Sequence, residues 1–208
     1  PQKRDFSVWT LDVGQGDCNV IFTKEGNVFV IDCGSTSEYK VGEKILIPFL
    51  KYHGVGRIDG IIISHPDADH MNGILELLEQ GSEENIETDR VYIYEKGMQN
   101  EPQAWSELMD LTIKNEIDIY GIGQGDVLQT ESFRMECIYP MNEQTGLTGN
   151  ASSLVMIAEY DEFRGVFTGD IEAEGEQRLV DEYETSPLFG QKKCNFLKVA
   201  HHGSSTSR

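Results

Sequence analysis

Residues 64–70 read Ser-His-Pro-Asp-Ala-Asp-His and directly follow a short apolar run, Gly60–Ile63. An apolar run of this length between turn signals is typical of a strand buried on both faces. Four side chains that can bind metals stand within six residues at the end of this strand: His65, Asp67, Asp69 and His70. In α/β proteins, ligands bind beside the carboxyl ends of the strands, where these side chains lie. The density of such side chains favours a metal site over a turn in which Asp69 only caps the next helix.

Two later strand ends carry the same kinds of side chain. Asp170 follows the strand expected at Arg164–Thr168, and His201 and His202 follow the strand expected at Phe196–Ala200. Taken singly, Asp170 could cap the helix that follows it, and the histidines could be ordinary polar loop residues. The carboxyl ends of parallel strands meet at one edge of a sheet. Three such ends with metal-binding side chains therefore predict a shared site.

The remaining pattern predicts alternating strands and helices. Further strands are expected at Phe6–Asp12, Cys18–Thr23, Val28–Asp32, Val91–Tyr94, Ile117–Tyr120, Val127–Gln129, Phe133–Tyr139 and Ser153–Tyr160. Helical spacing of apolar residues predicts helices at Glu43–His53, Gly73–Gln80, Trp105–Asn115 and Ile171–Glu182. No Pro/Gly/Ser linker divides the chain, so residues 1–208 are expected to form one α/β domain in which helices flank two sheets.

The charge balance restricts the partners. The chain has 17 Lys+Arg against 36 Asp+Glu, a formal net charge of −19. Proteins that hold nucleic acid usually present a basic face, so DNA would have to be held by a local patch or by bound cations. No apolar run approaches the roughly 20 residues of a transmembrane helix, and no signal-peptide pattern opens the sequence.

The four cysteines form no CxxC pair, which argues against a cysteine zinc site. If Glu25–Gly26 is a two-residue hairpin turn, Cys18 faces Cys33 and a cross-strand disulfide is possible; if Gly26–Asn27 is the turn, the two are out of register. Two small buried thiols remain the favoured interpretation. The turn before Cys18 could place Asp17 near the site, although a tight glycine hairpin is favoured there.

Together these motifs resemble the metallo-β-lactamase superfamily, whose loop reads H-x-H-x-D-H where this chain has His65-x-Asp67-x-Asp69-His70. More narrowly, the chain is similar from about residue 6 onward to the soluble domain of the ComEC/Rec2 family of bacterial competence DNA-uptake channel proteins. The supporting segments are LDVGQGD at 11–17, VIDCGS at 30–35, IPFLK at 47–51, FTGD at 167–170 and LKVAHHGS at 197–204.

The resemblance implies a four-layer αββα sandwich with the site at one edge of both sheets. One metal site would be formed by Asp69, His70, Asp170 and His201. A second would be held by His65 and a bridging Asp170. The wider family has histidines at the positions of Asp67 and Asn150. It also continues beyond the position of Arg208 with a helix, a strand and another histidine-bearing loop, so the sandwich is expected to lack its last elements.

Asp67 offers an oxygen ligand in place of an imidazole, so the ligand set is harder in the sense of hard and soft metal ligands. This shifts the preference from zinc toward manganese or magnesium. We therefore expect one tightly held divalent ion, zinc or manganese, and a second, weaker one. Asp69, expected to orient the attacking water, and Asp170 are the predicted catalytic residues. Asn150, His202 and Ser204 are possible contacts to metal or substrate.

The resemblance implies a metal-dependent phosphodiesterase or nuclease that acts on DNA during uptake. Its partner would be the membrane-embedded channel portion of a parent protein, at the extracytoplasmic face of the bacterial membrane. Two alternatives stay open: a hydrolase of small esters or phosphodiesters, and a module of the channel with little or no catalytic activity.

Overall fold

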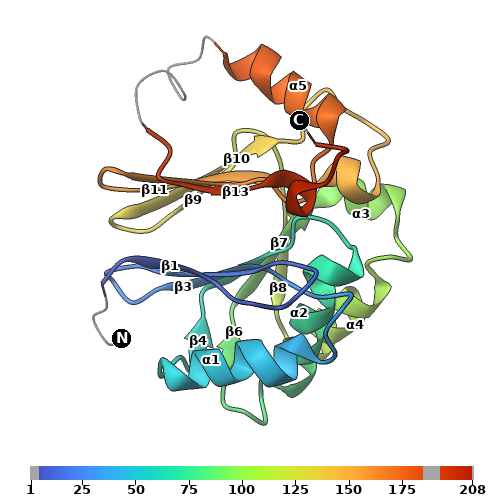
Figure 1. Cartoon of the computed structure of the whole chain (residues 1–208). Helices are drawn as coiled ribbons and strands as arrows, with labels where there is room; N and C mark the ends of the chain where they lie inside the picture. Colours follow the sequence, from blue (N-terminus) through green and yellow to red (C-terminus); the bar gives the residue numbers. More distant parts are fainter. Residues whose placement is uncertain (1–4, 185–192, 208) are drawn as a thin grey trace.

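Two β-sheets lie face to face at the centre of the computed structural model, which describes residues 5–184 and 193–207 (Figure 1). The first sheet has six strands, in the spatial order β1 (Ser7–Thr10), β2 (Cys18–Phe22), β3 (Val28–Cys33), β5 (Gly60–Ile62), β7 (Arg90–Tyr94) and β8 (Asp118–Ile122). The β1–β2 and β2–β3 pairs are antiparallel, and every pair from β3 to β8 is parallel. The carboxyl ends of four strands consequently share one edge.

The second sheet has five strands, in the spatial order β13 (Phe196–Lys198), β12 (Phe163–Phe167), β11 (Val155–Tyr160), β10 (Phe133–Tyr139) and β9 (Val127–Gln129). Only the β12–β13 pair is parallel. The ends of β12 and β13 therefore point the same way, and the segments that follow them lie next to each other. A separate two-stranded ladder pairs β4 (Arg57–Ile58) with β6 (Glu87–Thr88).

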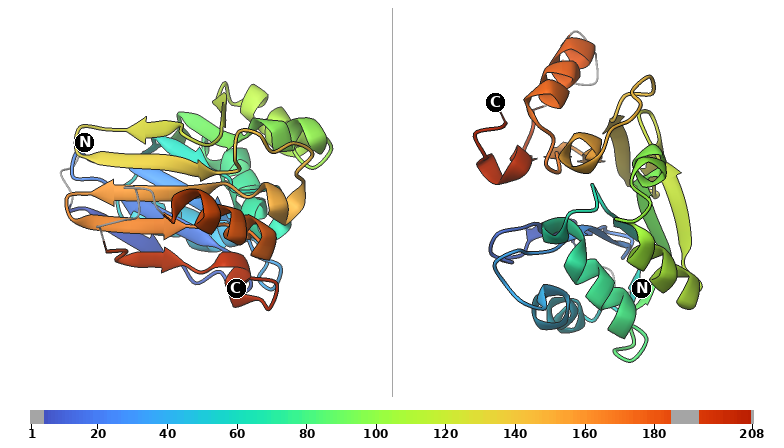
Figure 2. Two further views of the ribbon diagram at one scale, coloured as in Figure 1. Left: turned by 90° about the horizontal axis from the view of Figure 1, so that it is seen from above. Right: turned by 90° about the vertical axis from the view of Figure 1, so that its right-hand side faces the viewer.

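Helices cover the outer face of each sheet (Figures 1 and 2). Below the first sheet lie α1 (Ile47–Tyr52), which a π-helical turn at Gly42–Leu46 precedes, α2 (Ala68–Gln80) and α4 (Ser106–Lys114). Above the second sheet lies α5 (Ala173–Tyr183), and α3 (Glu95–Asn100) follows β7 directly. The layers therefore run helix, sheet, sheet, helix.

Three apolar cores fill the spaces between these four layers. Along β3, Val28 and Val30 pack with the helices while Phe29 and Ile31 pack between the sheets. A strand buried on both faces needs such an uninterrupted apolar run, since alternate side chains point to opposite faces. The third core lies between the second sheet and α5. The expected αββα sandwich is confirmed.

Several element boundaries differ from the expectation. Helix α2 begins at Ala68, not at Gly73, and Asp67 stands at its N-cap position. The interpretation of Asp69 as the N-cap is therefore wrong, and Asp69 lies in the first helical turn. The N-cap position of α5 is Glu172, so Asp170 is not a cap either. Helix α3 and the β4–β6 ladder were not expected, because neither is long enough to show a periodic pattern.

Cys18 and Cys33 face each other through a bulge rather than through either expected turn. Phe22 pairs with Val28 and Asn19 with Ile31, and the register shifts by one residue before Cys18 pairs with Cys33. The extra residue is Asp32, whose φ is +56°. Both thiols are buried and free, as the favoured interpretation expected. The bulge re-aims the Asp32 side chain, a common use of bulges beside functional sites.

Candidate metal centre

The predicted side chains gather at one end of the sandwich, the right-hand end in Figure 1. Segments that precede β2, follow β3 and β5, and open α2 reach this end from the first sheet. The segments that follow β12 and β13 reach it from the second sheet. The site therefore lies across the seam between the two sheets.

Two glycines allow backbone segments at the edge of the first sheet to approach one another closely at this end. A side chain on Gly34 would place its Cβ 2.3 Å from the Ala68 carbonyl oxygen, and one on Gly16 would place it 2.1 Å from the Gly34 carbonyl oxygen. Only glycine fits such approaches. The Asp17 amide then donates a hydrogen bond of 3.0 Å to the Asp69 carbonyl oxygen. This packing sets Asp17 beside the first turn of α2.

Four side chains offer ligand atoms that all lie within 4.8 Å of one another: Asp17, His70, Asp170 and His202. Of the predicted ligands, His70 and Asp170 are in this group. His202 was expected only as a possible contact, and Asp17 was considered less favoured than a plain hairpin. We refer to these four residues as the Asp/His cluster.

His70 is fixed on one side and open on the other. Its ring is fully buried, and its Nδ1 lies 3.0 Å from Asp32 Oδ2. Asp32 also accepts hydrogen bonds from the backbone amide and hydroxyl of Ser64. A histidine that donates Nδ1–H to a carboxylate presents Nε2 to the metal, an arrangement common in metalloproteins. Sequence reasoning missed Asp32, although its position at a strand end was a usable indication.

The field at His70 favours a positive charge. Burial alone would lower the pKa of His70, but the charges of the Asp32 and Asp170 carboxylates raise it to about 10. The distance from His70 Nε2 to Asp170 Oδ1 is 3.1 Å. Without a metal this pocket holds a proton, and a metal cation would occupy the same favourable potential.

Asp170 joins the two sheets electrostatically. Burial alone would raise its pKa, but the imidazoles of His202 and His70 and the charge of Lys198 hold the pKa of this carboxyl well below its usual range. Lys198 Nζ lies 3.1 Å from Asp170 Oδ1 and also contacts Asp17 Oδ2. Lys198 was not singled out from the sequence.

Of the adjacent histidines, His202 rather than His201 faces the cluster. Its Nε2 lies 3.3 Å from Asp170 Oδ2 and 3.5 Å from Asp69 Oδ2, and these two carboxylates raise the pKa of His202 to about 9. His201 Nε2 is 3.9 Å from Asp170 Oδ2, and its Nδ1 is hydrogen-bonded to Thr206. Both histidines have φ near +50°, a left-handed turn that no strand pattern predicts.

His65 and Asp67 form a separate pair beside the cluster. His65 is fully buried, with Nδ1 near the hydroxyls of Ser64 and Ser153 and Nε2 3.6 Å from Asp67 Oδ2. The hydrogen bond from His65 lowers the pKa of Asp67, whose side chain is half exposed. The residue that approaches His65 from the segment just before β11 is Ser153. Asn150 lies three residues earlier, in a short 3-10 helix.

The donors fit a divalent cation. The Nε2 atoms of His65, His70 and His202 are buried and have no hydrogen-bond partner of good geometry. Buried polar atoms are rarely left without one, and imidazole with carboxylate suits zinc, manganese or iron. The residues present therefore match the group that the sequence predicts. The Ser204 hydroxyl, by contrast, accepts a hydrogen bond from the Thr206 amide within its own loop.

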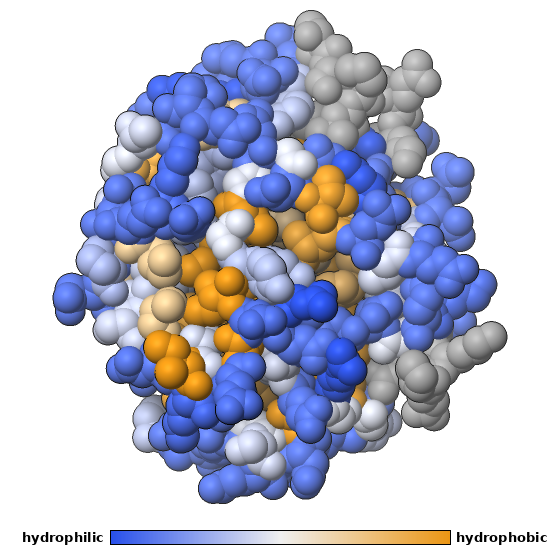
Figure 3. All heavy atoms as spheres, turned by 180° about the vertical axis from the view of Figure 1, so that it is seen from behind, coloured by the Kyte–Doolittle hydropathy of each residue, from blue (hydrophilic) through white to orange (hydrophobic). Residues whose placement is uncertain are grey.

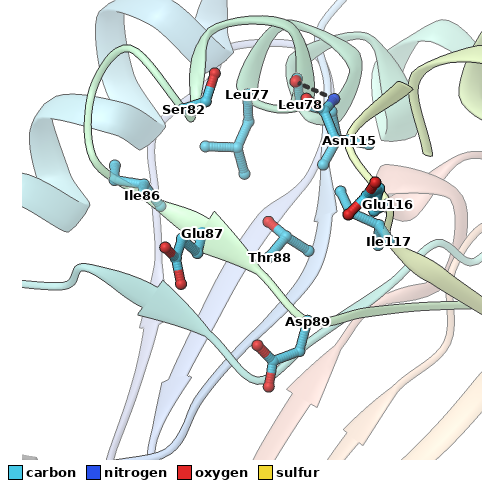
Figure 4. A pocket seen from close by; sticks show the side chains of 11 residues that line it. Leu77, Leu78, Ser82, Ile86, Glu87, Thr88, Asp89, Asn115, Glu116 and Ile117 are labelled. Atoms are coloured by element: carbon cyan, nitrogen blue, oxygen red, sulfur yellow. Dashed lines mark hydrogen bonds between the residues drawn. The ribbon is translucent and has the colours of Figure 1, made fainter. Parts of the chain in front are cut away.

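A cavity of about 300 Å³ lies at the far end of α2, about 15 Å of helix away from the cluster. Figure 4 shows its lining by residues of α2, of the loop into β6 and of the segment after α4. It is lined by no histidine, lysine or cysteine. This cavity carries none of the chemistry described above.

The metallo-beta-lactamase superfamily matches residues 11–131, more than half of the chain. The chain therefore belongs to this superfamily. It is also 30% identical over 211 residues to ComE operon protein 3 of Bacillus subtilis (strain 168), covering 95% of this chain and 25% of that protein. Competence protein ComA of Neisseria gonorrhoeae is 25% identical over 205 residues, covering 99% of this chain and 25% of that protein.

The resemblance expected from the motifs is thus confirmed, and the chain spans about a quarter of the length of these relatives. A solved B3 metallo-beta-lactamase with an active-site glutamic acid superposes with a TM-score of 0.59 at 15% identity, over 97% of this chain and 78% of that chain. That likeness supports the fold alone. Within residues 5–184 and 193–207, no helix is long and apolar enough to cross a membrane.

Proposed function

We propose that this protein is a metal-dependent phosphodiesterase that cuts DNA. The observation that carries the proposal is the Asp/His cluster, in which two imidazoles with open Nε2 atoms meet two buried carboxylates. The similarity to competence proteins favours DNA as the substrate. Manganese and zinc are the favoured ions, because the donors are both nitrogen and oxygen.

A divalent ion held here would polarise a phosphoryl group and lower the pKa of its water. The chain's own residues do the rest. His70 and His202 would hold the ion, and Asp32 keeps His70 in the tautomer that presents Nε2. Asp69, whose side chain is 19% exposed beside His202, would accept a hydrogen bond from the attacking water. Asp170 would hold the ion from the second sheet, and the pair His65–Asp67 would provide a second, weaker position.

The net charge of −19 opposes the approach of a polyanion. We infer that DNA is held by contacts close to the ion rather than by a broad basic groove. A small phosphodiester or ester meets less repulsion, and this observation keeps a small-substrate hydrolase as the second candidate.

The test compares DNA and small chromogenic substrates with manganese, zinc or magnesium, in the wild type, in Asp170→Asn and in Asp181→Asn. Asp181 is exposed on α5 and serves as the matched control. We expect metal-dependent cutting of DNA that falls at least ~100-fold in Asp170→Asn, since that carboxylate both binds the ion and fixes its neighbours. The control should match the wild type.

Each alternative predicts a different result. Turnover of chromogenic esters or phosphodiesters without cutting of DNA would favour the small-substrate hydrolase. Less than about one ion per chain after dialysis against manganese or zinc, with no turnover, would favour a module with little or no catalytic activity.

We further propose that this single domain belongs to a longer parent with a membrane-embedded channel portion, and that it works at the extracytoplasmic face of the bacterial membrane. The length of the competence relatives, about four times that of this chain, supports the longer parent. Protease digestion of intact cells against lysed cells tests it. An epitope in this domain should be cleaved in both.

A further inference from the structure

Lys198 is a buried cation at the edge of the candidate centre. It ends β13, where alternate residues face opposite sides of the sheet: Leu197 is 57% exposed, whereas Phe196 packs against the core between the sheets. Lys198 shares the face of Phe196, and its side chain is only 8% exposed. Lysine is almost never buried to this extent unless its charge is paired.

Its ammonium group lies against three oxygen atoms. Nζ donates to the Gly169 carbonyl oxygen at 2.8 Å and to Asp170 Oδ1 at 3.1 Å, and it contacts Asp17 Oδ2. An ammonium has three protons and no acceptor capacity. The ammonium therefore has three oxygen neighbours, and two of them belong to carboxylates of the Asp/His cluster.

The position between Asp17 and Asp170 is thus already taken by a positive charge. A divalent ion that bridged the same two carboxylates would compete for the same oxygen atoms and would lie within a few ångströms of the ammonium. Like charges at that separation repel strongly in a buried site. The atoms left for a metal are the Nε2 atoms of His70 and His202 and the Oδ2 atoms of Asp170 and Asp69. Of the two histidines, His202 lies against Asp170 Oδ2, and His70 lies against Oδ1.

We propose that Lys198 replaces a second cation at this centre, so that the cluster loads one divalent ion on the histidine side of Asp170. The inference rests on the proposed function only in requiring that the cluster binds a metal. In this arrangement Lys198 is a positioning residue: it neutralises Asp17 and holds one oxygen of Asp170, which leaves the other oxygen for the ion.

The test counts tightly bound Mn²⁺ by native mass spectrometry, without substrate, after loading with excess metal and removal of weakly bound ions by buffer exchange. We expect one tightly bound ion in the wild type, in Lys198→Arg and in the control Lys114→Gln, whose side chain is exposed on α4. Lys198→Gln should bind two ions, because it removes the charge and frees the oxygens of Asp17 and Asp170. Two tightly bound ions in the wild type, or one in folded Lys198→Gln, would overturn the inference. A wild type that binds none would overturn the proposed function instead.

A second measurement needs no variant. Acetylation of surface amines, mapped by peptide mass spectrometry, should leave Lys198 unmodified both before and after Mn²⁺ is added, because the ammonium keeps its three oxygen neighbours in both forms. Acetylation of Lys198 that begins only when the metal is added would show that the ion displaces the ammonium, and the inference would fail.

Discussion

At the scale of single residues, His70 depends on a partner that is not itself in the Asp/His cluster. Asp32 lies 38 positions earlier in the chain, and it fixes the ring of His70 through Nδ1. The bulge that puts Asp32 at a φ of +56° aims its carboxylate at Ser64 and His70. Asp32 therefore controls which nitrogen of His70 is free for a metal.

Replacement of Asp32 by Asn should weaken metal binding by about 10–100-fold, the usual cost of losing the partner of a metal-binding histidine. The amide cannot accept from both Ser64 and His70 with the strength of a carboxylate. Isothermal titration with Mn²⁺ measures the effect, and Asp118→Asn, on the exposed edge of β8, is the control. Unchanged affinity would show that Asp32 only supports the fold.

The thiols provide a second prediction at this scale. Burial raises the pKa of Cys18 well above its ordinary value and that of Cys137 to about 12, whereas Cys194 is exposed. The thiolate is the reactive form. A disulfide reagent at pH 8 should therefore react with one thiol in the native protein and with four in denaturant, and at pH 9 still with one. Two thiols in denaturant would show that Cys18 and Cys33 are bonded.

Sequence patterns predicted the residues of the cluster that lie in a dense motif. His70 stands among other metal-binding side chains, and Asp170 directly follows a strand. Lys198 was not found in this way, and Asp17 was considered only as the less favoured alternative, because each is a single charged residue whose function depends on contacts made across the sheets. The choice between His201 and His202 depends on two left-handed residues, which a pattern of residue types does not encode.

At the scale of elements, the start of α2 packs against the end of β3 through direct contact between backbone atoms. The close contact between Gly34 and residues 68–70 leaves no room for a Cβ, which would lie 2.4 Å from the Asp69 carbonyl carbon. This contact sets the position of the helical turn that carries Asp69 and His70.

Gly34→Ala should consequently lower the free energy of unfolding by about 1–3 kcal/mol, the usual cost of overpacking, and should weaken Mn²⁺ binding as well. Denaturant unfolding and calorimetric titration measure the two effects. Gly56→Ala is the matched control, since its Cβ would find its nearest neighbour at 3.6 Å. Normal metal binding in a destabilised Gly34→Ala would show that the position of α2 does not control metal binding.

Most strands, and an α/β domain in which helices flank two sheets, were predictable from the apolar runs, whereas the four-layer arrangement was expected from the family resemblance. The start of α2 was not predictable, because Pro66-Asp67 can open a helix immediately and the charged residues after it show no apolar period. Asp69 was expected as a ligand in an extended loop, but it lies on the first turn of α2. Its side chain then points across to His202 instead of toward His65.

At the scale of the whole molecule, the surface is dominated by hydrophilic side chains. Figure 3 shows them around most of one face, with apolar side chains exposed mainly toward its middle. With a net charge of −19, long-range repulsion should limit encounters with DNA. The Debye length falls from about 30 Å at 0.01 M salt to about 8 Å at 0.15 M.

Raising the salt concentration across this range should therefore increase kcat/KM for DNA severalfold in the presence of Mn²⁺. Proteins with a basic groove show the opposite trend, because salt weakens their phosphate contacts. A small chromogenic phosphodiester is the control and should respond much less. A steep fall of kcat/KM for DNA with salt would indicate a local basic surface.

Metal binding should also stabilise the folded chain. At a free Mn²⁺ concentration 100 times the dissociation constant, the gain is about 2.7 kcal/mol, which corresponds to roughly 5–10 °C in the melting temperature of a chain of this length. A calorimetric scan with and without Mn²⁺ measures it, and His70→Ala should show little gain. An equal gain in that variant would place the ion elsewhere.

The seam on which the Asp/His cluster lies has one more consequence. Asp17 and His70 belong to the half built on the first sheet, and Asp170 and His202 to the half built on the second. An ion bound by His70 of the first half and by Asp170 and His202 of the second would link two halves that otherwise hold together through the apolar layer between them. Removal of the metal by a chelator should then affect stability as well as activity. The two halves would separate more readily, and amide protons along β12 and β13 would exchange faster than those in the interior of the first sheet.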